Sequence, residues 1–171
     1  PNEEIREEFI RSIKNGSRKE LVKAVELSDK LLRATINKDE STVAEIIGEA
    51  HQANTSPKFY NNEQALRSVV IMAYLSSVDD YIRFEELASG KGYIDLLFLP
   101  ALQSSKPALI IEFKWNKSAE KAVQQEQDQQ YWKFAKQFRY KGKILLVGIN
   151  YNSKTKKHTC KIKEIESLEK N

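Results

Sequence analysis

Two apolar, strand-like segments of the sequence carry charged residues near one another. In the run Ala108–Trp115 (ALIIEFKW), Glu112 and Lys114 stand two positions apart. Side chains in a strand alternate between its two faces, so these two groups point to the same face. Asp95 interrupts the earlier apolar run at residues 93–99 in the same way. If the two runs pair as hairpin neighbours, one acid from each strand lies side by side on one face.

Two neighbouring carboxylates in an apolar setting repel each other, because unpaired buried charge is costly. A divalent cation resolves this conflict, and Mg²⁺ typically takes one or two protein carboxylates while keeping positions for water and phosphate. Lys114 would then meet the water or the phosphate. Metal and ammonium together can activate a water and neutralise the charge that builds on a phosphodiester during hydrolysis. The alternative is a structural Glu112–Lys114 ion pair with Asp95 as a strand-end acid.

The elements that would position these residues follow the order helix, three strands, helix, two strands. The first helix is capped by Asn61 or Asn62 and runs to about Ser76, and the second starts after Ser118 and spans roughly twenty residues. The predicted strands cover residues 81–86, 93–99, 108–115, 143–150 and 158–165, the last with the alternation of an edge strand. We therefore predict an α/β fold with a central mixed sheet flanked by helices.

The first third of the chain has a different character. Apolar spacing predicts helices over residues 3–13, 19–35 and 43–50, and no catalytic constellation occurs among them. We interpret residues 1–56 as a helical connector or extension and residues 57–171 as the domain that carries the site. The chain begins with Pro1 instead of Met, so we expect it to be a piece of a longer protein.

The composition is that of a soluble globular protein. The 171 residues are 40% hydrophobic and 30% charged, which argues against disorder, and no apolar run approaches the length of a bilayer span. Cys160 is the only cysteine, so a disulfide framework and a thiolate zinc cluster are excluded. No signal peptide is present, and a cytoplasmic setting is the default expectation. The net charge of +4 permits a nucleic-acid partner without requiring one.

Residues 59–165 resemble the PD-(D/E)XK nuclease superfamily in motif and in element order. That family has an acid on its first helix, an Asp on its second strand and E-x-K on its third, which here correspond to Glu63, Asp95, and Glu112 with Lys114. The resemblance implies a restriction-endonuclease-like core in which Asp95, Glu112 and the carbonyl of Phe113 hold Mg²⁺ or Mn²⁺. It further implies that Lys114 positions or activates the attacking water and that Glu63 holds a metal-bound water or a second ion.

The chain also resembles the C-terminal half of a bacterial family that joins an AAA-type ATPase-like domain to a PD-(D/E)XK domain. The similar segments are PNEEIREEF, FYNNEQALRSVV, GYIDLLFLP, ALIIEFKW and AEKAVQQEQDQQYWKF. The family helix carries a Gln six residues before a Tyr, which implies that Gln125 and Tyr131 contact the substrate side of the site. A helical projection instead puts Gln125 opposite the apolar side, and Glu126 stands where the family has an apolar residue. The sequence has no Walker-type loop, so an ATPase part would lie outside it.

We therefore predict a Mg²⁺-dependent deoxyribonuclease that works with an ATPase-like domain in cis. The alternative is a catalytically silent domain kept as a nucleic-acid-binding or regulatory module. The basic runs at 133–143 and 154–163 could follow a phosphate backbone, although such runs are usually only a solvated face. We expect His51 and His158 to be plain surface or structural residues. The pattern itself does not distinguish DNA from RNA, and it carries no information on oligomeric state.

Overall fold

The computed structural model describes residues 18–54, 63–88, 92–102, 104–131, 133, 138 and 140–165. The predicted helix at 3–13, the predicted caps Asn61 and Asn62, and the basic residues Lys136 and Arg139 lie outside the described residues.

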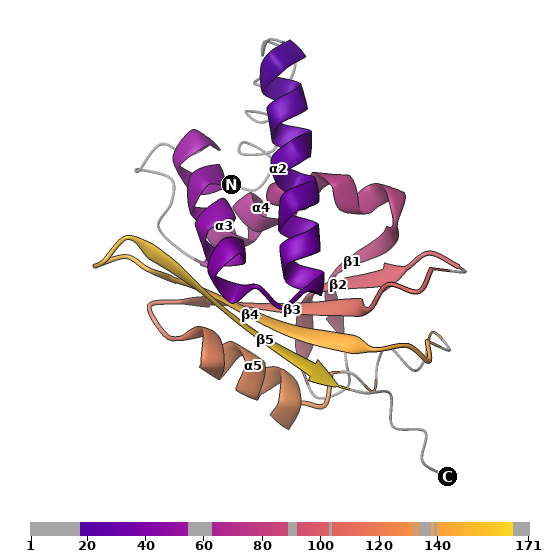
Figure 1. Ribbon diagram of the computed structural model, residues 1–171. Helices are drawn as coiled ribbons and strands as arrows, with labels where there is room; N and C mark the ends of the chain where they lie inside the picture. Colours follow the sequence, from indigo (N-terminus) through magenta and orange to yellow (C-terminus); the bar gives the residue numbers. More distant parts are fainter. Residues whose placement is uncertain are drawn as a thin grey trace.

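A five-stranded mixed sheet forms the centre of the molecule (Figure 1). Its strands are β1 (Tyr81–Ala88), β2 (Tyr93–Pro100), β3 (Ala108–Trp115), β4 (Ile144–Asn152) and β5 (Lys157–Ile165), and they neighbour one another in that order. β3 and β4 are parallel, and every other neighbouring pair is antiparallel. A parallel pair needs a crossover connection, which contains α5 (Ala119–Asp128). The predicted α/β architecture is confirmed.

The remaining helices cover the face of the sheet opposite α5 (Figure 1). They are α2 (Arg18–Ile36), α3 (Glu40–Asn54) and α4 (Glu63–Ala73), and a short 3₁₀ helix, Leu75–Asp79, leads from α4 to β1. Side-chain caps mark the starts of two helices. Asp39 accepts the backbone N–H of Thr42 at 3.1 Å ahead of α3, and Ser118 accepts that of Lys121 at 3.2 Å ahead of α5.

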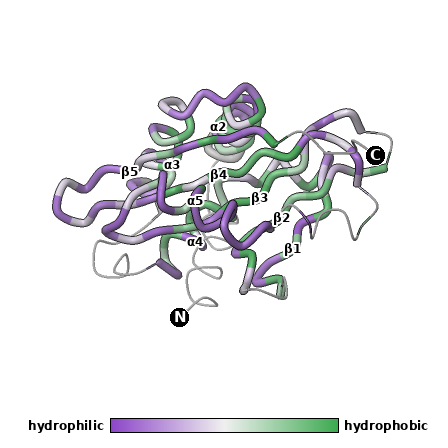
Figure 2. Tube along the Cα trace, turned by 90° about the horizontal axis from the view of Figure 1, so that it is seen from below, coloured by the Kyte–Doolittle hydropathy of each residue, from purple (hydrophilic) through white to green (hydrophobic). Residues whose placement is uncertain are grey.

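Apolar side chains on the two faces of the sheet form two clusters. The larger lies between the sheet and α2, α3 and α4, and the smaller lies between the sheet and the segment that contains α5 and Tyr131. Seven of the eight residues of β3 are buried, as expected for a strand that is covered on both sides. Figure 2 shows the resulting concentration of hydrophobic residues along β2, β3 and β4. A charged pair on β3 therefore lies in an apolar environment.

The helical extension is tied to the sheet and to Tyr74, the residue that follows α4, by polar contacts as well as by apolar packing. The hydroxyls of Thr35 and Tyr74 lie 2.6 Å apart in the core, and Glu40 accepts the backbone N–H of Ile162 at 2.9 Å. Within the described ranges, none of the helices has the combined length and apolarity of a bilayer-spanning segment.

Several predicted boundaries differ from the observed ones. α3 and β1 are longer than predicted, and α4 ends at Ala73. The largest error concerns α5, which has 10 residues and ends at Asp128. Just beyond it Gln130 adopts φ 55°, a left-handed conformation that cannot continue the helix. No Gly or Pro marks this end, so the sequence offered no stop signal.

Candidate active site

The two predicted strand carboxylates lie opposite each other where β2 and β3 separate. The last pair of the β2–β3 ladder is Leu96 with Ile111, and extending the same register by one residue places Asp95 opposite Glu112. At that point the Asp95 side chain replaces a ladder bond, because its Oδ2 accepts the backbone N–H of Phe113 at 3.0 Å. The sequence-based pairing of the two motif strands is therefore correct.

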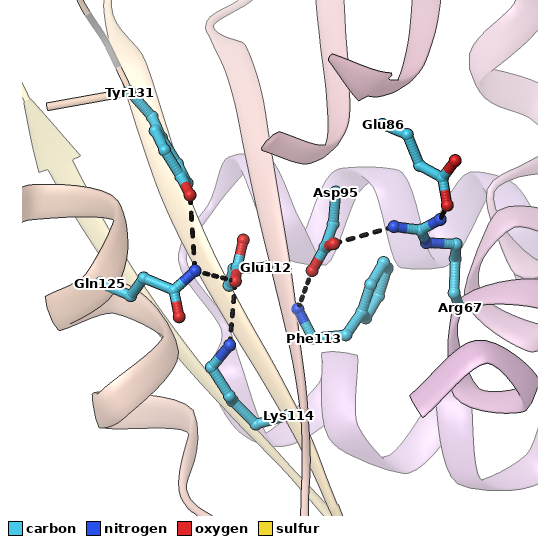
Figure 3. Close-up of polar contacts among 8 residues, drawn as sticks. All are labelled: Arg67, Glu86, Asp95, Glu112, Phe113, Lys114, Gln125 and Tyr131. Atoms are coloured by element: carbon cyan, nitrogen blue, oxygen red, sulfur yellow. Dashed lines mark hydrogen bonds and ion pairs between the residues drawn. The ribbon is translucent and has the colours of Figure 1, made fainter. Parts of the chain in front are cut away.

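Glu112 and Lys114 form an ion pair inside the protein. Lys114 Nζ donates to Glu112 Oε1 at 2.9 Å, and the two residues are only 3% and 7% exposed, respectively. Gln125 of α5 donates its side-chain amide to the same oxygen (Figure 3). Glu112 Oε2 is buried and has no hydrogen-bond partner within the described part of the chain. A buried acceptor in this state is costly, which marks it as a position for a further ligand.

The burial of this pair changes the protonation of Glu112. Burial and, to a smaller extent, the negative charge of Asp95 raise the pKa of Glu112, while the contact with Lys114 lowers it, and together these effects place that pKa at about 7. Burial by itself would lower the pKa of Lys114, but the hydrogen bond and charge of Glu112 outweigh it, so that pKa lies above its ordinary value. Lys114 is therefore a cation at neutral pH.

Asp95 has a second partner that sequence reasoning did not identify. Arg67 of α4 donates Nη2 to Asp95 Oδ1 at 2.8 Å, and its Nη1 contacts Glu86 of β1. Figure 3 shows Asp95 between Glu112 on the α5 side and Arg67 on the α4 side. No local sequence pattern indicated this contact, because it joins residues 28 positions apart.

Glu63 occupies the first position of α4, as expected, but its side chain is exposed and does not point inward. Helical spacing alone predicts that Glu63 shares the face of Leu66 and Val70 and points inward, and this expectation is wrong, because those two residues are buried and Glu63 is exposed. The position is still close to the site, because its negative charge contributes to raising the pKa values of Glu112 and Lys114.

Comparison with protein families places this geometry in context. A model of the PD-(D/E)XK nuclease superfamily matches residues 61–161, more than half of the 171-residue chain. The chain belongs to the PD-(D/E)XK nuclease superfamily. The match begins just before α4 and extends into β5, so it covers the elements that form the restriction-endonuclease-like core. Comparison with curated proteins gave no match.

The Gln and Tyr carried over from PD-(D/E)XK relatives do reach the site. Gln125 contacts Glu112, and its amide nitrogen lies 3.4 Å from the hydroxyl of the buried Tyr131. The helical projection that turned Gln125 away was wrong, because it oriented the helix by aromatic residues that come after the end of α5. The actual buried side is set by Ala119, Ala122, Val123 and Glu126.

Glu126 is a fully buried acid of this PD-(D/E)XK core. Neither carboxylate oxygen has a hydrogen-bond partner of normal geometry among the residues that the structure describes. Burial raises the pKa of Glu126 well above its ordinary value, and the charge of Glu112 raises it further, while the Val147 amide offsets little of this. Glu126 therefore holds its proton more strongly than an exposed glutamate does.

PD-(D/E)XK nucleases generally use divalent metals. Among the described residues, no group of three or more His, Cys, Asp and Glu side chains is arranged to hold an ion. Mg²⁺ needs only one or two protein carboxylates beside waters, and the unpartnered Glu112 Oε2 with Asp95 next to it supplies such donors. The oxygen donors present fit a hard divalent cation.

Proposed function

We propose that this protein is a metal-dependent phosphodiesterase that hydrolyses DNA. The observation that carries the proposal is the placement of Asp95 opposite Glu112, with Lys114 bonded to Glu112 and one Glu112 oxygen without a partner. Membership of the PD-(D/E)XK superfamily supports the same reaction class.

Each site residue has a role in this proposal. Asp95, Glu112 and the backbone carbonyl of Phe113 would hold Mg²⁺ or Mn²⁺, which when bound supplies charge neutralisation at the phosphodiester. Lys114 orients the attacking water through Nζ. Glu63 holds a water or a second ion at the exposed start of α4. Gln125 fixes the orientation of Glu112 from the α5 side, and Tyr131 in turn contacts the Gln125 amide.

The wider setting is part of the proposal. The resemblance of several segments to a family with an AAA-type ATPase-like domain supports such a domain acting in cis in the longer protein. DNA is the expected partner, and the cytoplasm is the expected compartment.

One observation favours a second candidate function. Glu112 and Lys114 are nearly closed to solvent, and both oxygens of Asp95 already accept hydrogen bonds. A site with these properties also suits a catalytically silent PD-(D/E)XK domain that binds nucleic acid or regulates the ATPase-like part.

DNA cleavage by purified protein distinguishes these functions. Linear, supercoiled and single-stranded DNA are incubated with the protein and Mg²⁺ or Mn²⁺, beside Lys114→Met, which keeps side-chain length but removes the charge. The control is Lys117→Ala, a substitution of an exposed lysine on the loop after β3. We expect cleavage by wild type and Lys117→Ala and a loss of at least about 100-fold in Lys114→Met. Equal cleavage by all three proteins points to a contaminant, and retained DNA binding without cleavage supports the silent module.

Calorimetric titration of Mn²⁺ tests the metal site independently of cleavage. We expect wild type to bind the ion and Asp95→Asn to bind it at least about tenfold more weakly, because a charged oxygen donor is lost. Asp128→Asn, an exposed acid at the end of α5, serves as the control. Identical heats for wild type and Asp95→Asn would exclude Asp95 as a ligand.

A further inference from the structure

Arg67 connects two acids that differ in their surroundings. Its guanidinium donates Nη2 inward to Asp95 at 2.8 Å and Nη1 outward to Glu86 (Figure 3). The Arg67 side chain is only 10% exposed, so the cation is held inside the protein. Burial alone would lower the pKa of Arg67, but the contacts with Glu86 and Asp95 outweigh burial and raise it. Arg67 therefore stays charged whichever anion occupies its outer nitrogen.

The inner partner is fixed by the fold. The Asp95 side chain is 18% exposed, and its second oxygen is bonded to the backbone N–H of Phe113 on the neighbouring strand. A charge-assisted bond between two restrained groups is strong. The Nη2–Asp95 contact is therefore the permanent one.

The outer partner is held loosely. The Glu86 side chain is 60% exposed, and exposed ion pairs contribute little stability. Glu86 also has φ 50°, a left-handed conformation that is unfavourable for a non-glycine residue. The β1–β2 ladder passes from Glu85–Leu96 to Leu87–Ile94 at this point, without a Glu86–Asp95 pair. A solvent-accessible carboxylate on strained backbone is a partner that another anion can replace.

We propose that Arg67 is a phosphate-binding residue of the site and that Glu86 occupies the phosphate position in the absence of substrate. Nη2 stays on Asp95, while Nη1 exchanges the Glu86 carboxylate for a non-bridging oxygen of a DNA phosphate. This inference rests on the proposed phosphodiester substrate and adds the residue that places it. The planar guanidinium suits the role, because it can bond two oxyanions in fixed directions.

This role explains why the buried Arg67 is bonded to Asp95, a candidate metal ligand. A phosphate on Nη1 is held at a fixed distance from Asp95 by a single rigid group, so binding and positioning are coupled. Phosphate contacts fix the register of a bound nucleic acid without reading its sequence. Arg67 is therefore a positioning residue for substrate and does not react itself.

Binding of a fluorescein-labelled DNA duplex, followed by anisotropy in EDTA, tests the exchange without metal or cleavage. Glu86→Gln removes the negative charge that competes with phosphate for Nη1 and should tighten binding about threefold. The matched control is Glu85→Gln, which removes the same charge from the next position of β1, where Glu85 pairs with Arg83 at 3.2 Å. Arg67→Gln should weaken binding about tenfold, more than the control Arg83→Gln. In the Arg67→Gln background, Glu86→Gln should have no more effect than Glu85→Gln.

Each outcome bears on a specific step. Equal effects of Glu86→Gln and Glu85→Gln would overturn the exchange even if wild type binds DNA and cuts it. Wild type that binds metal but no DNA would overturn both the exchange and the DNA substrate. Arg67→Lys provides a second variant should Arg67→Gln fold poorly, since it keeps the charge but loses the second nitrogen. Unchanged DNA binding by a folded Arg67→Lys would also contradict the proposal.

Discussion

At the residue scale, Glu126 is a group whose charge the fold accommodates poorly. It is fully buried on the inner side of α5, without normal hydrogen bonds to either oxygen among the described residues, and Glu112 adds a second negative charge nearby. A carboxyl in such surroundings keeps its proton, because ionisation would place an unpaired charge in an apolar interior.

Glu126 should make the protein less stable as pH rises. Because its folded-state pKa is raised above the ordinary value of 4.5, its stabilising contribution is complete below that pH and is lost progressively above it. The neutral Glu126→Gln has no such loss. The difference between its free energy of unfolding and that of wild type should therefore increase in favour of the variant, by up to about 1.4 kcal/mol for each unit of rising pH. Urea unfolding in EDTA from pH 5 to 8 measures the difference. The exposed Glu120→Gln on the same helix is the control, and parallel pH profiles for wild type and Glu126→Gln would contradict this account.

The sequence identified the residues of the site whose arrangement depends on strand geometry. Glu112 and Lys114 are neighbours because of their spacing alone, and Asp95 follows from pairing two consecutive strands. Arg67 could not be predicted from spacing along a strand or from the pairing of strands. Its contact with Asp95 spans 28 positions and depends on how α4 lies against the sheet, which no local pattern encodes.

At the element scale, the position of α5 decides whether Gln125 reaches Glu112. The helix lies very close to β4 at Gly148, where an added Cβ would collide with the backbone carbonyl of Ala119 and lie 2.8 Å from the Ala122 Cβ. A glycine is required for this approach. The sequence predicted the helix and its Ser118 cap, but the close approach at Gly148 depends on tertiary packing and had no signal of its own.

Two glycine substitutions should therefore have opposite effects on stability. Gly148→Ala pushes α5 away from β4 and should cost about 2 kcal/mol. Gly48→Ala in the interior of α3 brings its Cβ no closer than 3.6 Å to the His158 ring, an ordinary contact, and should stabilise by about 0.5–1 kcal/mol. Chemical denaturation of both variants measures these changes. A Gly148→Ala protein as stable as wild type would show that α5 does not need this close contact.

At the scale of the whole molecule, the helical extension and the PD-(D/E)XK core share one apolar cluster. Leu31 of α2 and Ile47 of α3 belong to the same buried cluster as Phe98 and Val147 of the sheet. The sequence separated residues 1–56 from the rest because they lack catalytic residues, and that division stays a prediction. Periodicity showed which faces of these helices are apolar, but the surface that they cover could not be read from it.

We expect α2, α3 and the sheet to unfold as one cooperative unit, because the buried apolar residues described for the two helices belong to the cluster that they share with the sheet. Ile47→Ala removes a fully buried side chain from the shared cluster and should lower the free energy of unfolding by about 3 kcal/mol. Far-ultraviolet circular dichroism follows the helices. In a Trp132→Phe background, which leaves Trp115 at the end of β3 as the one tryptophan of the sequence, fluorescence follows the sheet. Both signals should shift together in Ile47→Ala, whereas Val25→Ala, at a position of α2 that is 44% exposed, should change neither appreciably. A shift of the dichroism signal alone would show that the extension unfolds independently of the core.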